Sequence, residues 1–312
     1  MNIKKIGLTA LAGSLVVTSA YAGAMSVSGG ASIGLKNTTK TASGKSWTMG
    51  NQLTFSGSGE LDNGMNVSLS FVIDQGDDTA IASGPFDSHS VTISSDAMGT
   101  LKFSGEGGSS AQSALDTTAA GDLWDNGSGF GSPAASEAGN NSMLYTLPTL
   151  MDDLSIQASY SPAGAGKASG ATAFGATFTG VEGLSASIGI GESETIGSEA
   201  ESTTMKASYA ISSFTLAYSN TEHEFDLGSS SDEEVTSWKV SYTVSDDLSI
   251  SYGEEEHETE GSSVDEEADS VSISYTTGGV TLSATQYDFS GAGNSATGTD
   301  VERWALSATF AF

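Results

Sequence analysis

The chain has 312 residues, of which 37% are hydrophobic, with 39 glycines, 4 prolines and no cysteine. Its formal net charge of −29 excludes nucleic acid as an expected partner, because phosphate binding needs clustered lysine and arginine. The lack of cysteine excludes disulfides, which exported soluble proteins often use.

The first 22 residues have the pattern of a secretory signal peptide. Lys4 and Lys5 precede an apolar stretch over residues 6–17, and Ala20 and Ala22 supply small residues before a cleavage site. The apolar stretch is too short to span a bilayer as a helix, and a short membrane anchor is the alternative. Cleavage after Ala22 leaves 8 basic against 39 acidic residues, a net charge of −31.

The remaining residues 23–312 show alternation of apolar and polar side chains almost throughout. Successive side chains of a strand point to opposite faces, so each segment has one apolar and one polar face. This pattern predicts an all-β fold, a closed antiparallel transmembrane β-barrel of about 16 strands. The expected strands lie near 24–36, 45–57, 64–74, 87–95, 99–106, 141–147, 153–160, 170–180, 183–191, 202–211, 213–222, 235–245, 247–256, 267–276, 280–288 and 301–312.

The connections between these segments alternate between short and long. Asn63-Gly64 and Gly278-Gly279 have the chemistry of tight hairpin turns. In an up-and-down barrel this alternation places short periplasmic turns at one end and long external loops at the other, an asymmetry that a soluble sandwich does not need. The long connections are 37–44, 75–86, 107–140, 161–169, 192–201, 223–234, 257–266 and 289–300.

Tyrosines on the apolar face indicate two belts at the edges of a lipid-facing band, where amphipathic rings prefer to lie. The alternative is that strands are simply rich in tyrosine. The expected outer belt contains Tyr160, Tyr218 and Tyr252. The expected inner belt contains Tyr145, Tyr209, Tyr242 and Tyr275.

A barrel of this size encloses more space than side chains fill, which predicts a water-filled lumen. We therefore expect a channel in the outer membrane of a Gram-negative bacterium, surrounded by outer-membrane lipid and passing ions and small hydrophilic solutes. The acidic external mouth predicts weak cation selectivity.

The longest connection, 107–140, is a candidate constriction loop folded into the lumen, because long loops in compact folds are usually functional or disordered. We expect its acids to face bases on the lumen side of the wall, since charged side chains set ion preference in pores. The alternative is that the bases are ordinary lumen residues. The acids are Asp116, Asp122, Asp125 and Glu137. The bases are Lys36, Lys102, Lys206, Lys239 and Arg303.

Three stretches resemble the general porins of Gram-negative bacteria, especially those of α-proteobacteria. They are the first strand, residues 26–31, directly after the signal peptide; residues 141–148, similar to an Asn-Ser-x-x-Tyr-x-x-Pro motif; and the terminal Phe310-Ala311-Phe312, similar to an outer-membrane assembly signal. The resemblance implies a homotrimer of sixteen-stranded barrels, an inward third loop and recognition of Phe312 by the assembly machinery.

The chain departs from this family at two places. The Pro-Glu-Phe-Gly motif at the tip of the third loop is missing, and the nearest stretch is residues 127–131. The wall carries a single arginine where many relatives have a cluster.

No catalytic constellation is found, and we expect no enzyme activity and no cofactor. The three histidines are scattered, and Gly189-Ile190-Gly191 is not followed by a helix pattern. Dense acids in the external loops favour a solvated surface, with weak calcium or magnesium binding as the alternative. The competing functions are a surface adhesin or divalent-cation-stabilised β protein without a pore and, less favoured, a barrel hydrolase.

Overall fold

The structure, a computed structural model, describes residues 25–38, 44–74, 86–112, 117–127, 140–164, 170–195, 198–225, 231–295, 298 and 300–312. The expected signal peptide, residues 1–22, lies outside the described residues. No helix in the described ranges is long and apolar enough to cross a membrane.

The regular structure consists of sixteen strands and one short 3-10 helix, η3 (Leu123–Asn126). The strands are β1 (Met25–Thr38), β2 (Gly44–Glu60), β3 (Asn66–Asp74), β4 (Phe86–Ser95), β5 (Gly99–Glu106), β6 (Ser142–Thr146), β7 (Leu154–Ser161), β8 (Gly170–Phe178), β9 (Leu184–Thr195), β10 (Ser198–Ile211), β11 (Phe214–Phe225), β12 (Glu233–Ser245), β13 (Leu248–Thr259), β14 (Glu266–Thr277), β15 (Val280–Ser290) and β16 (Val301–Ala311).

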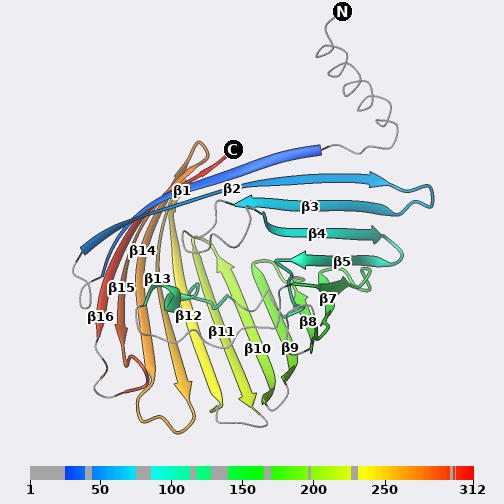
Figure 1. The fold of residues 1–312 in the computed structure, drawn as a ribbon. Helices are drawn as coiled ribbons and strands as arrows, with labels where there is room; N and C mark the ends of the chain where they lie inside the picture. Colours follow the sequence, from blue (N-terminus) through cyan, green and yellow to red (C-terminus); the bar gives the residue numbers. More distant parts are fainter. Residues whose placement is uncertain are drawn as a thin grey trace, which may run out of the picture.

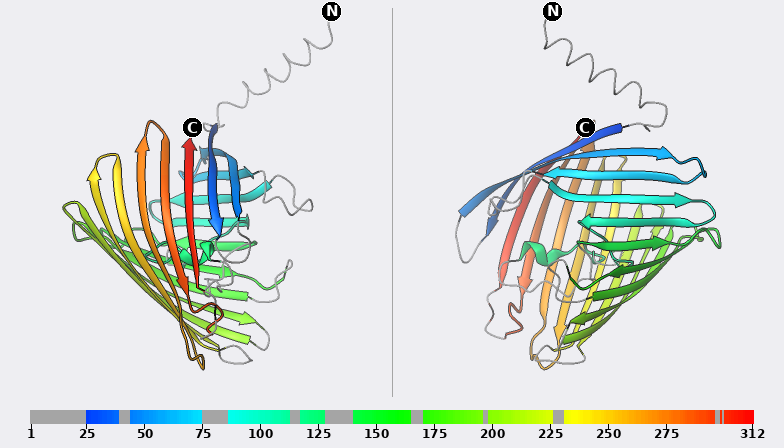
Figure 2. Two further views of the ribbon diagram at one scale, coloured as in Figure 1. Left: turned by 90° about the vertical axis from the view of Figure 1, so that its left-hand side faces the viewer. Right: turned by 45° about the vertical axis from the view of Figure 1, so that its right-hand side comes forward.

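The sixteen strands form one closed barrel (Figure 1). Each strand pairs antiparallel with its sequence neighbours, and β16 pairs with β1 from Gly30 opposite Ala311 to Thr38 opposite Arg303. Figure 2 shows from two sides how β1 and β16 run together to complete the wall. The prediction of a closed sixteen-stranded antiparallel barrel is confirmed. Closure leaves no unpaired strand edge, which is the condition for a sheet in lipid.

The outer face of the wall carries large apolar side chains that are about half exposed. Leu216 is 49% exposed and Ile273 is 45% exposed, both at strand positions whose neighbours point the other way. A soluble protein buries such a surface, whereas a membrane barrel presents it to acyl chains.

The tyrosines of the two predicted belts lie on this outer face at two levels. Tyr218 is paired with Trp238 towards the long-connection end, whereas Tyr242 is paired with Phe214 beside the short turns. The rings of Phe214 and Tyr242 are 4.8 Å apart. Amphipathic rings at both edges of the apolar band fit the two membrane interfaces.

The short turns have the backbone that their residues predict. Gly64, Gly278 and Gly279 adopt φ angles of 80°, 55° and 82°, which side chains with a Cβ rarely reach. The Asn63 side chain accepts a hydrogen bond from the Met65 N–H at 3.1 Å and closes the first turn.

At the opposite end the strands extend further than predicted, and this corrects the assignment of many acids to external loops. Strands β9 to β15 include residues that the alternation pattern assigns to connections. These connections are 192–201, 223–234, 257–266 and 289–300. Hydropathy alternation fails there because both faces of the wall are polar beyond the lipid. The acids that lie on strands although the sequence places them in these connections are Glu192, Glu194, Glu199, Glu201, Glu224, Glu233, Glu234, Glu258 and Glu266.

Candidate functional site

Parts of the connection between β5 and β6 lie on the inner wall of the barrel. The described parts are residues 107–112 and 117–127, followed by 140–141 before β6. Figure 1 shows η3 within the outline of the barrel beside β12 to β14. The wall positions that contact these residues are on the polar face of each strand, opposite in parity to the exposed apolar side chains.

Residues 110–112 are bonded to three strands of the wall, β7, β9 and β10, and the bond to β9 joins the Gln112 amide to the Gly189 carbonyl at 3.5 Å. The Ala111 N–H donates to Ser159 Oγ at 2.8 Å on β7. The Gln112 amide donates to the Ser202 carbonyl at 3.3 Å and accepts from Ser202 Oγ at 3.0 Å. The same amide donates to Thr204 Oγ1 at 3.3 Å. This segment therefore lies across β7 to β10.

Two glycines of the wall, Gly175 and Gly191, lie beneath this segment and allow its close approach. A Cβ built on Gly175 would lie 2.2 Å from the Ala111 carbonyl oxygen, and one on Gly191 would lie 2.5 Å from Gln112 Oε1. Both distances are shorter than real Cβ contacts. At Gly175 the clash is with backbone, so glycine is required there for this close approach, whereas at Gly191 the Gln112 side chain would have to shift.

Residues 118–122 form a compact turn closed by its own side chains. Asp122 Oδ1 accepts from the Thr118 N–H at 2.8 Å, and Thr118 Oγ1 accepts from the Asp122 N–H at 2.9 Å. The Gly121 N–H also donates to Thr118 Oγ1, at 3.1 Å. Asp122 has a φ of 53° and Gly121 a φ of 100°, and η3 begins directly afterwards.

Wall hydroxyls and one carboxylate bind the N–H groups of this turn. The Ala119 N–H donates to Ser219 Oγ on β11, and the Ala120 N–H donates to Ser237 Oγ on β12, each at 2.9 Å. Glu255 on β13 accepts from the Thr118 hydroxyl and from the backbone N–H groups of Leu123, at 2.8 Å, and Trp124.

Helix η3 covers a small apolar cluster on the inner face of β14 to β16, which the sequence analysis missed. Leu123 and Trp124 pack there with Ala120 of the turn. The sequence carried a signal for this cluster, because apolar residues occupy lumen-facing positions of these strands, where the other side chains are polar. The wall residues of the cluster are Ala268, Phe289 and Val301, with Tyr287 at its edge.

Three of the five predicted pore-lining bases donate hydrogen bonds to carbonyl oxygens of this connection. Lys206 Nζ donates to the Thr117 carbonyl at 2.6 Å, and Lys239 Nζ to the Ala120 carbonyl at 3.3 Å. Arg303 Nη1 donates to the Asn126 carbonyl. The ion pairs found within the described ranges involve none of these bases.

The other predicted site residues divide between described and undescribed positions. Lys36 on β1 and Lys102 on β5 have the lumen-facing parity, and Lys36 is close enough to Arg303 for their charges to repel. Asp122 is half-buried in the turn, and Asp125 is an exposed residue of η3. Asp116 and Glu137 lie outside the described residues.

A buried histidine between two acids is a second feature that the sequence analysis missed. His257 is 4% exposed on the inner face of β13, with Nε2 at 3.6 Å from Glu233 and Nδ1 at 3.4 Å from Glu266. The Trp124 ring meets the imidazole edge-on, with centroids 6.0 Å apart. Strand parity could have separated His257 from the surrounding exposed glutamates.

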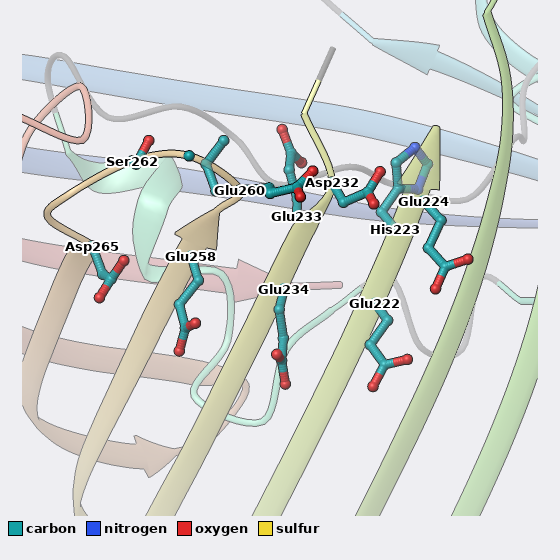
Figure 3. A pocket seen from close by; sticks show the side chains of 12 residues that line it. Glu222, His223, Glu224, Asp232, Glu233, Glu234, Glu258, Glu260, Ser262 and Asp265 are labelled. Carbon is teal, nitrogen blue, oxygen red and sulfur yellow. The ribbon is translucent and has the colours of Figure 1, made fainter. Parts of the chain in front are cut away.

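An acidic cavity of about 410 Å³ lies where β11, β12 and β13 end towards the long connections. Eight of its twelve lining residues carry a carboxylate. Figure 3 shows Glu222, Glu234 and Glu258 projecting the same way from the three strands, and these residues are paired in register. Like charges directly opposite on neighbouring strands repel, so this surface attracts cations from solution.

No group of three His, Cys, Asp or Glu side chains in the described ranges is arranged to hold a metal ion. The weak divalent-cation binding expected from the acidic sequence stays a prediction.

Comparison with solved structures gives close similarity of fold at low sequence identity. The anion-selective porin from Comamonas acidovorans aligns with a TM-score of 0.70 and 14% identity, over 93% of this chain and 99% of the other. A loop-deletion mutant of OmpT, an outer membrane protein of Vibrio cholerae, aligns with a TM-score of 0.69 and 14% identity, over 93% and 99%. A mutant of the Rh. blastica porin aligns at 0.68 and 14%, over 93% and 100%.

A search of the curated proteins finds no match. The family model described as Gram-negative porin matches residues 7–259, most of the chain. With the sixteen-stranded barrel and its apolar outer face, this match shows that the chain belongs to the Gram-negative porin family, outer-membrane β-barrel channels for small solutes.

Proposed function

We propose that this porin is a weakly cation-selective diffusion channel whose passage is narrowed by the connection 107–140. The observation that carries the proposal is the attachment of residues 110–112 and 117–127 to the inner wall by hydrogen bonds to β7 and β9 to β13. A segment held across the lumen reduces the area open to solutes and brings its charged groups to the passage.

The sign of selectivity follows from where the charges lie. The bases Lys206, Lys239 and Arg303 are engaged with loop carbonyls, so their charges are shielded from the passage by the segment that they bind. The carboxylates of the acidic cavity and neighbouring strand ends form a negative entrance, which enriches cations within about 8 Å at physiological salt. The shared fold of the anion-selective Comamonas porin does not set this sign, because lumen charges differ between porins.

The functional unit is proposed to be a trimer, as the family resemblance implies. The contact between subunits is proposed to lie on the outer face of β1 to β5. This face carries no tyrosine of either belt in the described ranges. Trp47 is the interfacial tryptophan of this face, and a face poor in such anchors fits a protein neighbour better than lipid.

The test is the reversal potential of the protein in a planar bilayer under a potassium chloride gradient. The fourfold variant Asp116→Asn, Asp122→Asn, Asp125→Asn and Glu137→Gln should shift selectivity towards anions. The matched control neutralises four acids of the short turns, Asp62, Asp96, Asp152 and Asp246, and should shift it less.

Three results would count against parts of the proposal. An anion-selective wild type refutes the acidic-entrance argument. An unchanged reversal potential in the fourfold variant refutes the narrowing by 107–140. A wild type with no conductance refutes the channel and favours the adhesin alternative.

A further inference from the structure

The most completely buried charged side chain of the described wall belongs to Glu255. It is 0% exposed, although it stands on the lumen side of β13 in a barrel whose interior holds water. The cover that removes it from water is the turn 118–122 and the start of η3.

The carboxylate has no basic partner among the described ion pairs. In its ionised form it is stabilised by hydrogen bonds from the Thr118 hydroxyl and from the N–H groups of Leu123 and Trp124, which offset its burial. All three donors belong to the connection 107–140, and none belongs to the wall. A buried carboxylate is strongly unfavourable without such donors. The burial of Glu255 and the attachment of the segment that supplies the donors therefore depend on each other.

The wall also holds residues 117–126 through two neutral serine hydroxyls and through the charged donors Lys206, Lys239 and Arg303. Ser219 and Ser237 are neutral acceptors for single N–H groups, and Lys239 reaches the Ala120 carbonyl at 3.3 Å. Hydrogen bonds to an ionised acceptor are roughly twice as strong as neutral ones. Glu255 therefore contributes more to attachment than either serine.

The segment that Glu255 holds is internally closed. Thr118 and Asp122 bond to each other through two pairs of atoms, and Leu123 and Trp124 pack as one unit on the apolar cluster of β14 to β16. Such a unit attaches as a whole, so losing the contacts of Glu255 weakens the attachment of all of residues 118–126, which the other wall contacts share.

We propose that Glu255 is the positioning residue of this porin's constriction: its negative charge holds residues 118–126 against the wall and thereby sets the width of the passage. The proposal rests on the proposed function, since width matters only in an open channel. It differs from a packing role because the charge, and not the shape of the side chain, is the cause.

The decisive variant is Glu255→Gln, which keeps shape and removes charge. Its amide nitrogen would face N–H or O–H donors, so at least one hydrogen bond is lost along with the charge. The matched control is Glu254→Gln, the same change at the neighbouring residue, which points outward and is bonded to Tyr252. A second pair in the loop itself is Thr118→Val, which loses the hydroxyl, and Thr118→Ser, which keeps it.

Two measurements are made on purified, refolded protein. Hydrogen exchange reports attachment of residues 118–126, and uptake of a monosaccharide and a trisaccharide into proteoliposomes reports width. Glu255→Gln should speed exchange in this segment about tenfold or more, as expected for losing a charged hydrogen bond. It should also raise the trisaccharide rate relative to the monosaccharide rate. Glu254→Gln should change neither value.

Each result decides the matter. Equal exchange in the two glutamine variants overturns the anchoring role, and faster exchange with an unchanged sugar ratio overturns the control of width. If Glu255→Gln does not refold, Thr118→Val must show both effects and Thr118→Ser neither, or the proposal is wrong. A wild type that passes no sugar refutes the channel itself, while the exchange comparison still decides whether Glu255 anchors the segment.

Discussion

Phe312 and Gly29 exchange both of their backbone hydrogen bonds, at 2.8 and 3.0 Å, and the Phe312 ring lies where a Gly29 side chain would be. A Cβ on Gly29 would be 2.6 Å from that ring. The last residue of the chain thus continues the seam between β16 and β1 on the outer face.

Deletion of Phe312 should impair assembly in cells more than folding in detergent. It removes two hydrogen bonds from the end of the ladder, each worth about 1 kcal/mol, and leaves the other register pairs of β1 and β16 intact. The terminal ring is 75% exposed and so accessible to an assembly factor. Surface levels in cells and heat-modifiability of the refolded protein test this, and a truncated protein at normal surface levels contradicts it.

A lysine on the lipid face should cost much more than one on the lumen face. Val240 stands opposite the outward residues Leu216 and Tyr252, whereas Ser241 points inward. Val240→Lys should destabilise the barrel in bilayers by about 2–4 kcal/mol, the cost of a lysine near the midplane. Ser241→Lys should cost far less, as judged by denaturant unfolding in lipid vesicles. Equal costs would show that the two faces are assigned the wrong way round.

Alanine at Gly175 should lower conductance. Its Cβ would meet the Ala111 carbonyl at 2.2 Å, so the backbone of residues 110–112 must move away from the wall and into the passage. Overpacking of this kind costs about 1–3 kcal/mol. The control is Gly30→Ala, also on the lumen face, where the nearest atom is 3.5 Å away. Single-channel recording of both variants is the measurement, and a Gly175→Ala conductance equal to that of Gly30→Ala excludes the displacement.

Removal of the Trp124 ring should free the connection without unfolding the barrel. Trp124 is 3% exposed and fills the inner apolar cluster, and a buried tryptophan changed to alanine typically costs about 3–5 kcal/mol. Because the strand ladder is untouched, this loss falls on attachment of η3. Trp124→Ala should therefore be cleaved faster by thermolysin within 117–127 at unchanged thermal stability. Trp47→Ala, a 74% exposed outward residue, should resist cleavage like the wild type.

The sequence predicted the barrel because its strands follow a local rule. Two features depend on neighbouring residues alone and can be recognised in the sequence. They are the alternation of apolar and polar side chains with a period of two, and the turn glycines Gly64, Gly278 and Gly279. The rule failed where both faces of the wall are polar, so the strand ends bearing Glu194 and Glu258 were assigned to loops.

The candidate site was less predictable because its contacts join distant residues. The position of η3 depends on Thr118 reaching Glu255, 137 residues away, and on Leu123 packing near Phe289. No periodicity encodes such pairs. Strand parity separates Glu255 from Glu254 and Glu256, but alternation does not show that the turn 118–122 covers it.

The extension of β9 to β15 past the apolar band changes the nature of the negative entrance. Carboxylates on flexible loops present an averaged field that ions deform as they arrive. Carboxylates on paired strands, such as those of Glu222, Glu234 and Glu258, are attached to backbones that lie about 4.8 Å apart in a hydrogen-bonded lattice. Because these three residues share the outward parity of Tyr218, Trp238 and Tyr252, an arriving ion meets this stationary pattern of charge on the outside of the rim before it reaches the lumen.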